Sequence, residues 1–153
     1  MTRLCVSLFG IGFLRPWPGT WGSLAALGPA VAVLALGGPA AVLVGAGIIA
    51  AVGWWAVTKE LALTGERDPE WIVIDEAAGQ WLTLAGLSHI GWFGVLAAFA
   101  VFRLFDIAKP GPVGWADRQC GSHGVMLDDL VAGALAACVL LVLGAAFPLE
   151  LFP

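Results

Sequence analysis

Hydrophobic residues run through the chain in three long stretches that contain no Asp, Glu, Lys or Arg. These stretches cover residues 16–58, 77–102 and 130–149. A helix needs about 20 consecutive apolar residues to cross a bilayer, and each stretch reaches that length. Ala, Gly and Leu dominate them, and small residues let helices approach closely in lipid. Because no strand-like alternation of β-branched residues occurs, the pattern predicts an all-α protein that forms an integral membrane helical bundle.

The lengths of the stretches predict about four to five short transmembrane or re-entrant helices. The first stretch holds 43 residues, about 64 Å of helix, which is enough for two crossings joined by a Gly-Gly-Pro turn at 36–41. The second holds 26 residues. It forms either one long crossing or two short legs that bend at 86–91. The third stretch predicts one crossing.

The basic residues favour the bent form of the second stretch. With a bend, all seven Lys and Arg residues fall on the same side of the membrane as the N-terminus. Lys and Arg are enriched on the cytoplasmic side, so we expect this charged side to face the cytoplasm. The legs of the bent pair hold about 16 residues each and are short for a full crossing, so they either span or dip. We expect one membrane-embedded domain over residues 1–153.

Composition excludes several classes of function. Of 153 residues, 60% are hydrophobic and 12% are charged, and the net charge is −4. A soluble domain carries about 25% charged residues, and an acidic chain argues against nucleic acid as a partner. The three cysteines, Cys5, Cys120 and Cys138, are widely spaced and suggest neither a disulfide framework nor a zinc site. The chain also lacks a P-loop and the G-x-S-x-G elbow of serine hydrolases.

The bent topology brings six acidic residues to one membrane face: Asp75, Glu76, Asp106, Asp117, Asp128 and Asp129. Three basic residues lie among them: Arg103, Lys109 and Arg118. Carboxylates at membrane depth usually mark function, and crowded like charges must bind protons or cations. Carboxylate oxygens without a nearby His or Cys pair suit Mg²⁺ better than a transition metal. The pattern therefore predicts a Mg²⁺ site.

Each acidic pair also has a structural interpretation. Asp128 and Asp129 directly precede the last apolar stretch and could cap its helix. One cap needs one aspartate, however, and adjacent helical residues point about 100° apart, so the pair can serve two roles. Asp75 and Glu76 could be ordinary first-turn acids of a helix. Four apolar or aromatic residues precede them, which puts them past the polar loop.

Two further segments carry groups that suit phosphate. Arg103, Asp106 and Lys109 recur every three residues and share one face of a helix end. They form either a surface salt-bridge ladder or a cationic phosphate site. The turn-rich segment "RPWPGTWGS" at 15–23 precedes a predicted helix. Its glycines and hydroxyls suit an anion at a helix N-terminus, and its tryptophans also suit a plain interfacial loop.

Together these motifs resemble the phosphatidylglycerophosphatase A family. The matching segments are "GTWGS", "IDEAAGQW", "FRLFDIAKPGPVGWADRQ" and "HGVMLDDLVAG", in an order and spacing that cover about residues 10–135. The resemblance implies an enzyme of the bacterial inner membrane. Together with the apolar stretches and the placement of the basic residues, it predicts a multi-pass protein with its active site at the cytoplasmic face. It implies Mg²⁺-dependent removal of the terminal phosphate of the lipid phosphatidylglycerophosphate, giving phosphatidylglycerol in phospholipid biosynthesis.

The resemblance also implies a role for each motif residue. The metal ligands are expected to be Asp75, Glu76, Asp106, Asp128 and Asp129. The substrate is expected to contact Gly19, Thr20, Ser23, Arg103 and Lys109. The catalytic residues are expected to be Glu76, Asp106, Asp129, Arg103 and Lys109.

In the expected phosphoric monoester hydrolase, a metal-activated water attacks phosphorus and Glu76 takes its proton. A covalent aspartyl-phosphate is the competing mechanism, but the chain lacks the usual Asp-x-Asp pair. Two other functions remain open: a small membrane transporter, and a non-catalytic membrane assembly protein that binds a divalent cation. The sequence leaves the number of metal ions and the oligomeric state open.

Overall fold

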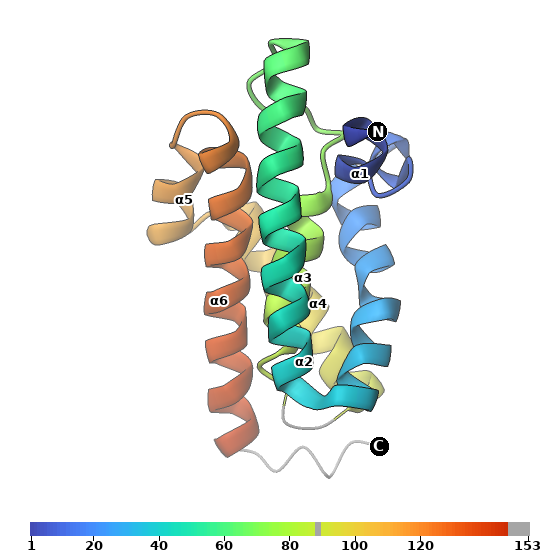
Figure 1. Cartoon of the computed structure of the whole chain (residues 1–153). Coiled ribbons are helices and arrows are strands. Elements are labelled where there is room, and N and C mark those ends of the chain that lie inside the picture. The colour runs from blue at the N-terminus through green and yellow to red at the C-terminus, as the bar shows by residue number, and fades with distance from the viewer. Residues whose placement is uncertain (88–89, 147–153) are drawn as a thin grey trace.

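The computed structural model describes residues 1–87 and 90–146. Within these ranges the regular secondary structure is helical throughout and contains no strand. The longer helices lie side by side along one common axis (Figure 1). The prediction of an all-α protein is therefore confirmed for the described residues.

The longest helix, α2 (Pro18–Thr64), is a hairpin of two antiparallel legs (Figure 1). The backbone leaves helical geometry at Gly38, where φ is 71° and ψ is −175°. Glycine adopts a positive φ without steric cost, and Pro39 cannot donate the hydrogen bond that would continue the helix. The turn predicted at 36–41 is therefore confirmed. The two legs measure about 30 Å and about 39 Å.

The N-terminal segment packs against one end of this hairpin. It consists of α1 (Thr2–Val6) and the short 3-10 helix η1 (Ile11–Phe13). The Thr2 hydroxyl donates a 2.7 Å hydrogen bond to Glu60 near the end of α2. The N–H of Val73 donates a 2.9 Å hydrogen bond to the carbonyl oxygen of Val6, which ties the loop before α3 to the same end.

The second apolar stretch is broken into α3 (Ile74–Leu84) and α4 (Trp92–Ala108), as the bent arrangement predicted. These helices hold 11 and 17 residues. They are about 16 Å and about 26 Å long, less than the roughly 30 Å of a bilayer's hydrocarbon core. Residues 88 and 89 of the predicted bend lie outside the described residues.

The chain ends with the short helix α5 (Pro112–Asp117) and the long helix α6 (Ser122–Ala146). Because α6 begins at Ser122, Asp128 and Asp129 lie in its second turn. The interpretation of these aspartates as helix caps is therefore wrong. The helix begins in the small and polar residues before the apolar run, and hydrophobicity alone does not mark that start.

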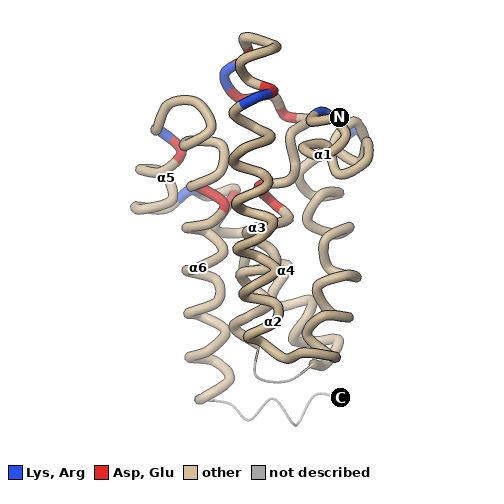
Figure 2. Tube along the Cα trace, viewed as in Figure 1, with Lys and Arg blue, Asp and Glu red and all other residues tan. Residues whose placement is uncertain are grey.

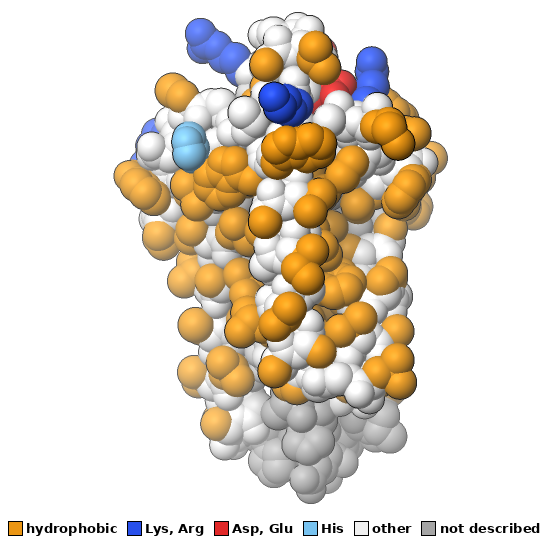
Figure 3. Space-filling model, in the orientation of Figure 1, with side chains coloured by type: hydrophobic (Ala, Val, Ile, Leu, Met, Phe, Trp, Pro, Cys, Tyr) orange, Lys and Arg blue, Asp and Glu red, His pale blue; other side chains and the backbone are white. Residues whose placement is uncertain are grey.

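Two helices among the described residues are long and apolar enough to cross a bilayer: α2, with 47 residues, and α6, with 25. This finding rests on length and composition, and a larger number of membrane helices stays a prediction. The charged residues of the described ranges gather toward one end of the molecule (Figure 2). Below that end, apolar side chains cover much of the visible surface (Figure 3).

Candidate functional site

A cavity of about 550 Å³ lies at the charged end of the helices. Its wall comes from the first turn of α2, the loop before α3, the start of α3, the end of α4 and the upper part of α6. The predicted residues in this wall are Gly19, Thr20, Asp75, Glu76, Arg103, Asp106, Lys109, Asp128 and Asp129. The structure thus gathers all predicted metal-binding and catalytic residues around one space.

Close packing of α3 against α6 positions the acids of these two helices. An ideal Cβ on Gly133 would overlap the carbonyl oxygen of Gly79, so only glycine fits this contact. The Thr83 hydroxyl donates a 2.9 Å hydrogen bond to the same carbonyl oxygen. Such small residues let two helix backbones approach closely. As a result, the first turn of α3 faces Asp129 on α6.

The carboxylates form two groups that share one member. In the first, ligand oxygens of Asp75, Glu76 and Asp129 lie within 4.8 Å of one another. In the second, those of Asp106, Asp128 and Asp129 lie within 4.8 Å of one another. Asp129 belongs to both groups and is 3% exposed. Three helices, α3, α4 and α6, therefore deliver oxygens to one cluster.

Several carboxylate oxygens of this cluster have no protein partner. Glu76 Oε2, Asp128 Oδ1 and Asp129 Oδ1 are buried and accept no hydrogen bond from any described residue. Burying an unpaired charged oxygen is costly, so such atoms call for a cation or a proton. The cavity wall contributes no His or Cys from the described ranges. Its donor set consists of hard oxygens and fits Mg²⁺.

The pKa shifts of two acids in the first turn of α3 also indicate that this cluster suits a cation. This helix is not one of the two candidate spans. Burial, followed by the charge of Glu76, raises the pKa of the Asp75 carboxyl well above its usual range. Burial, followed by the charge of Asp129, raises the pKa of Glu76 to about 8. A divalent cation in the cluster would reverse both shifts by favouring the ionised carboxylates.

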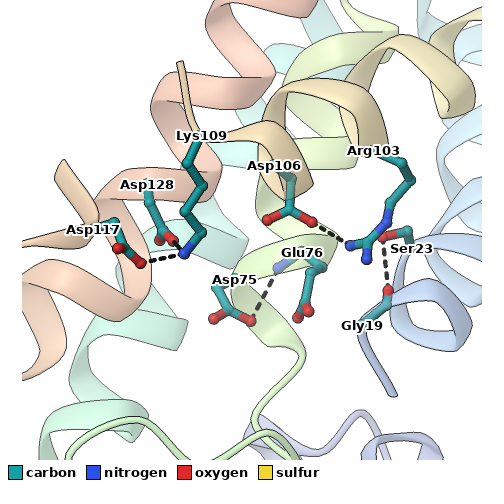
Figure 4. Close-up of polar contacts among 9 residues, drawn as sticks. All are labelled: Gly19, Ser23, Asp75, Glu76, Arg103, Asp106, Lys109, Asp117 and Asp128. Atoms are coloured by element: carbon teal, nitrogen blue, oxygen red, sulfur yellow. Dashed lines mark hydrogen bonds and ion pairs between the residues drawn. The ribbon is translucent and has the colours of Figure 1, made fainter. Parts of the chain in front are cut away.

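Both predicted phosphate-binding cations are held by carboxylates (Figure 4). Arg103 forms an ion pair with Asp106 one turn further along α4. Lys109, just past the end of α4, forms ion pairs with Asp117 and, at 2.9 Å, with Asp128. Partial burial alone would lower the pKa of Lys109, but these two carboxylates raise it above its usual range. Lys109 therefore keeps its charge beside the acidic cluster.

The glycine and hydroxyl residues of α2 have different positions. Gly19 lies against Glu76 and Arg103, and an ideal Cβ on it would overlap Glu76 Oε1 and lie 3.2 Å from Arg103 Nη1. Thr20 lines the cavity. Ser23 is fully buried outside the cavity wall, and its hydroxyl donates a 2.8 Å hydrogen bond to the carbonyl oxygen of Gly19 (Figure 4). Ser23 therefore supports the position of Gly19 from behind.

Sequence reasoning assigned no site role to several residues of this region, among them Trp17, Ile107 and Asp117. Trp17 and Ile107 line the cavity, and Asp117 anchors Lys109. Asp117 could be grouped with the other acids from the topology, but its partner could not be predicted. Trp17 suited an interfacial loop, and nothing in the sequence distinguished Ile107 from its apolar neighbours.

Known proteins resemble this chain over most of its length. The phosphatidylglycerophosphatase A family matches residues 4–144. A phosphatidylglycerophosphatase A from Haemophilus influenzae is 39% identical over 132 residues, which cover 86% of this chain and 81% of the relative. A phosphatidylglycerophosphatase A from Escherichia coli is 37% identical over 143 residues, which cover 92% of this chain and 82% of the relative.

A further relative, from Bacteroides thetaiotaomicron, is named as a candidate phosphatidylinositol-3-phosphatase. It is 39% identical over 136 residues, which cover 82% of each chain. No solved structure matches the chain. The family match and the two bacterial relatives agree with the resemblance seen in the motifs. The chain belongs to the phosphatidylglycerophosphatase A family and is accordingly a phosphatase, a phosphoric monoester hydrolase.

Proposed function

We propose that this phosphatase acts on phosphatidylglycerophosphate in phospholipid biosynthesis, releasing phosphatidylglycerol and inorganic phosphate. The observation that carries the proposal is the cavity in which two carboxylate groups sharing Asp129 face Arg103 and Lys109. Carboxylates suit a divalent cation, while Arg and Lys suit phosphoryl oxygens. The identity of the lipid substrate is taken from the names of the Haemophilus influenzae and Escherichia coli relatives.

We assign Mg²⁺ as the cofactor. Its ligands would come from five acids of the cavity wall: Asp75, Glu76, Asp106, Asp128 and Asp129. The unpartnered oxygens among the described residues support this assignment, because a hard cation would satisfy them. When bound, Mg²⁺ supplies charge that polarises the phosphoryl group and makes water easier to deprotonate.

The residues of the chain bind and orient the substrate. Arg103 and Lys109 neutralise the non-bridging oxygens of the phosphoryl group, and Asp106 holds the guanidinium of Arg103 in position. Gly19 leaves room for Glu76 beside Arg103, and the Thr20 side chain is available to the phosphate.

Hydrolysis then exchanges one bond to phosphorus for another. A water oxygen attacks phosphorus, and the bond between phosphorus and the glycerol oxygen breaks. Glu76 accepts the proton from the attacking water and later releases it to solvent, and the departing glycerol oxygen takes up a proton from solvent water. Inorganic phosphate and phosphatidylglycerol leave the cavity. The lipid's acyl chains take no part in the chemistry.

We further propose a multi-pass arrangement in the bacterial inner membrane, with the cavity at the cytoplasmic face. The two legs of α2 and the length of α6 support three crossings, and α3 and α4 form a shorter pair beside them. The charged end of the described molecule carries its Lys and Arg residues, which favours the cytoplasmic side (Figure 2). The acids lie toward that end, where a lipid headgroup would be.

The test is phosphate release by the purified protein in lipid vesicles. The panel contains phosphatidylglycerophosphate, phosphatidic acid and phosphatidylinositol 3-phosphate, each with Mg²⁺ and with EDTA. We expect release from phosphatidylglycerophosphate, loss of release in EDTA, and slower release from the other two lipids. Faster release from phosphatidylinositol 3-phosphate would instead favour the activity in the name of the Bacteroides thetaiotaomicron relative.

Three substitutions test the site itself: Glu76→Gln, Asp106→Asn and Asp129→Asn. Each is expected to lower kcat by about 100-fold or more, because each removes a charge that acts on the transition state. Glu66→Gln, which changes an exposed acid outside the cavity wall, is the control. Hydrolysis that survives all three changes with its Mg²⁺ dependence intact would refute the proposed site. Absence of lipid phosphate release by the wild type would favour a transporter or an assembly protein.

A further inference from the structure

Two exposed apolar side chains line the acidic cavity. Trp17 immediately precedes α2 and is 73% exposed, and Ile107 near the end of α4 is 71% exposed. Both line the same cavity as Arg103 and the carboxylates. The lining of the charged cavity therefore includes two apolar residues that are exposed at the surface. The part of the cavity that they line is called the opening.

The apolar side of this opening continues along α4. Arg103 and Asp106 pair with each other at the cavity, whereas the residues that directly follow them are exposed and apolar. Leu104 is 63% exposed and lies one turn before Ile107. Successive helical residues point about 100° apart. The end of α4 therefore presents one charged face to the cavity and an adjacent apolar face to the surroundings.

Trp17 is held at the opening by an unfavourable backbone conformation. Its φ is 62° and its ψ is 65°, which is the left-handed region that bulky residues rarely adopt. It also occupies the N-cap position of α2 without a capping side-chain hydrogen bond, where Ser, Thr, Asp or Asn would be favoured. One turn on, Trp21 donates a 2.9 Å hydrogen bond to the carbonyl oxygen of Pro16, which fixes this loop. A strained, exposed tryptophan beside a reactive cavity indicates a functional position.

A ligand that satisfies this opening must have an anionic head and an apolar tail. The two cations of the cavity suit a phosphate, and the exposed Trp17, Leu104 and Ile107 suit hydrocarbon at a membrane interface. A second cavity of about 590 Å³, lined almost entirely by apolar residues, shares no lining residue with the acidic one. The two cavities are therefore lined by separate sets of residues, and the apolar side chains beside the phosphate-binding groups are those of the acidic cavity itself.

We propose that the opening between Trp17 and Ile107 is the lateral entrance for the lipid substrate. The terminal phosphate passes between these residues into the cavity, and the acyl chains remain outside against Trp17, Leu104 and Ile107. This inference rests on the proposed lipid phosphatase activity and adds the route and the residues that recognise the lipid portion. The three residues set the preference for a membrane-bound substrate over a soluble phosphate ester.

The experiment compares two forms of one substrate. One is long-chain phosphatidylglycerophosphate in phosphatidylcholine vesicles, and the other is its dihexanoyl analogue as a soluble monomer. The double variant Trp17→Gln/Ile107→Gln is expected to lose about tenfold or more in kcat/KM on vesicles, a loss that corresponds to one large apolar contact. On the dihexanoyl analogue the loss should be clearly smaller, because its short chains offer less hydrocarbon for these residues to contact.

Two matched variants complete the design. Trp115→Gln/Leu63→Gln changes exposed apolar residues outside the cavity lining and should behave as the wild type on both substrates. Trp17→Phe/Ile107→Leu keeps the opening apolar and should retain the vesicle preference. An equal loss on both substrates, or an unchanged vesicle rate in the glutamine variant, would overturn the entrance while leaving the phosphatase proposal standing. A wild type inactive on both substrates would overturn the phosphatase proposal and the entrance with it.

Discussion

The main-chain carbonyl oxygen of Asp129 occupies the space where a side chain on Gly79 would lie, 2.5 Å from an ideal Cβ. This contact brings α3 and α6 together directly beside the carboxylate cluster. The same Cβ would lie 2.6 Å from the ring of Phe102, so the glycine is enclosed by backbone on one side and a buried aromatic on the other. The distance between the two acidic helices therefore depends on the absence of a methyl group.

Gly79→Ala is expected to force α3 away from α6. Overpacking of this kind costs about 1–3 kcal/mol, and a displacement of about 1 Å at a reactive site can lower activity about 100-fold. Thermal unfolding and phosphate release measure the two effects. Gly47→Ala is the control, because a Cβ there meets nothing within 4 Å. Unchanged unfolding and activity in Gly79→Ala would contradict the close contact.

Asp129→Asn is expected to separate metal binding from stability. In EDTA the variant should unfold at the same temperature as the wild type or higher, because one of several crowded like charges is gone. With Mg²⁺, the wild type should gain stability by preferential binding to the folded state, and the variant should not. Differential scanning fluorimetry measures both conditions, with Glu66→Gln as control. A gain of wild-type size in Asp129→Asn would show that the shared aspartate does not bind the ion.

Lys109→Met is expected to destabilise the protein by an amount that does not change between about pH 7 and about pH 9. A lysine at its ordinary pKa is already protonated in this range, and the raised pKa of Lys109 extends the range upward, so its ion pairs with Asp117 and Asp128 stay intact and fail only as pH rises through the raised value. The loss should be about 1–3 kcal/mol, because Asp128 is left without its partner.

The measurement for Lys109 is thermal unfolding of wild type and variant at several pH values. Lys59→Met, which changes an exposed lysine, is the control and should have little effect. A stability difference that shrinks steadily from pH 7 to pH 9 would mean that Lys109 titrates near neutrality and is not held by its two carboxylates.

Gly19→Ala is expected to reduce activity more than stability. The added methyl group would meet the ends of the Glu76 and Arg103 side chains, which can move, whereas at Gly79 it would meet backbone. Displacing both groups should lower kcat by about 100-fold, with a stability change of about 1 kcal/mol or less. Steady-state kinetics and thermal unfolding test this, with Gly28→Ala on the same leg as control. A normal kcat would show that Glu76 does not need its position beside residue 19.

The helical breaks were predictable because Gly and Pro mark them locally. Gly38 and Pro39 interrupt a long apolar stretch, and the predicted bend at 86–91 separates α3 from α4. The start of α6 was not predictable from the apolar run, because the polar and small residues from Ser122 onward also form helix. Hydrophobicity marks the part of a helix that meets lipid, and the helix can extend beyond it.

The gathering of the acids was predictable from topology, since each acidic motif adjoins the same end of its helix. Which side chains pair with each other within the cluster was not predictable, because the pairing depends on which side chains reach from one helix to another. Three contacts could not be predicted for this reason: the membership of Asp129 in both carboxylate groups, the ion pair of Lys109 with Asp117, and the hydrogen bond of the buried Ser23 hydroxyl. The dependence on Mg²⁺ and the roles of individual acids stay predictions.

The turn between the two legs of α2 lies at the end of the molecule opposite the charged residues (Figures 1 and 2). Neither leg carries an ionisable side chain between residues 16 and 58. Carrying one charged side chain to the centre of a bilayer helix costs about 2.5–3.5 kcal/mol, and this hairpin incurs no such cost. In the proposed membrane arrangement, the hairpin would therefore enter the lipid tip first as a preassembled unit, and both of its ends would remain on the side where the chain is synthesised.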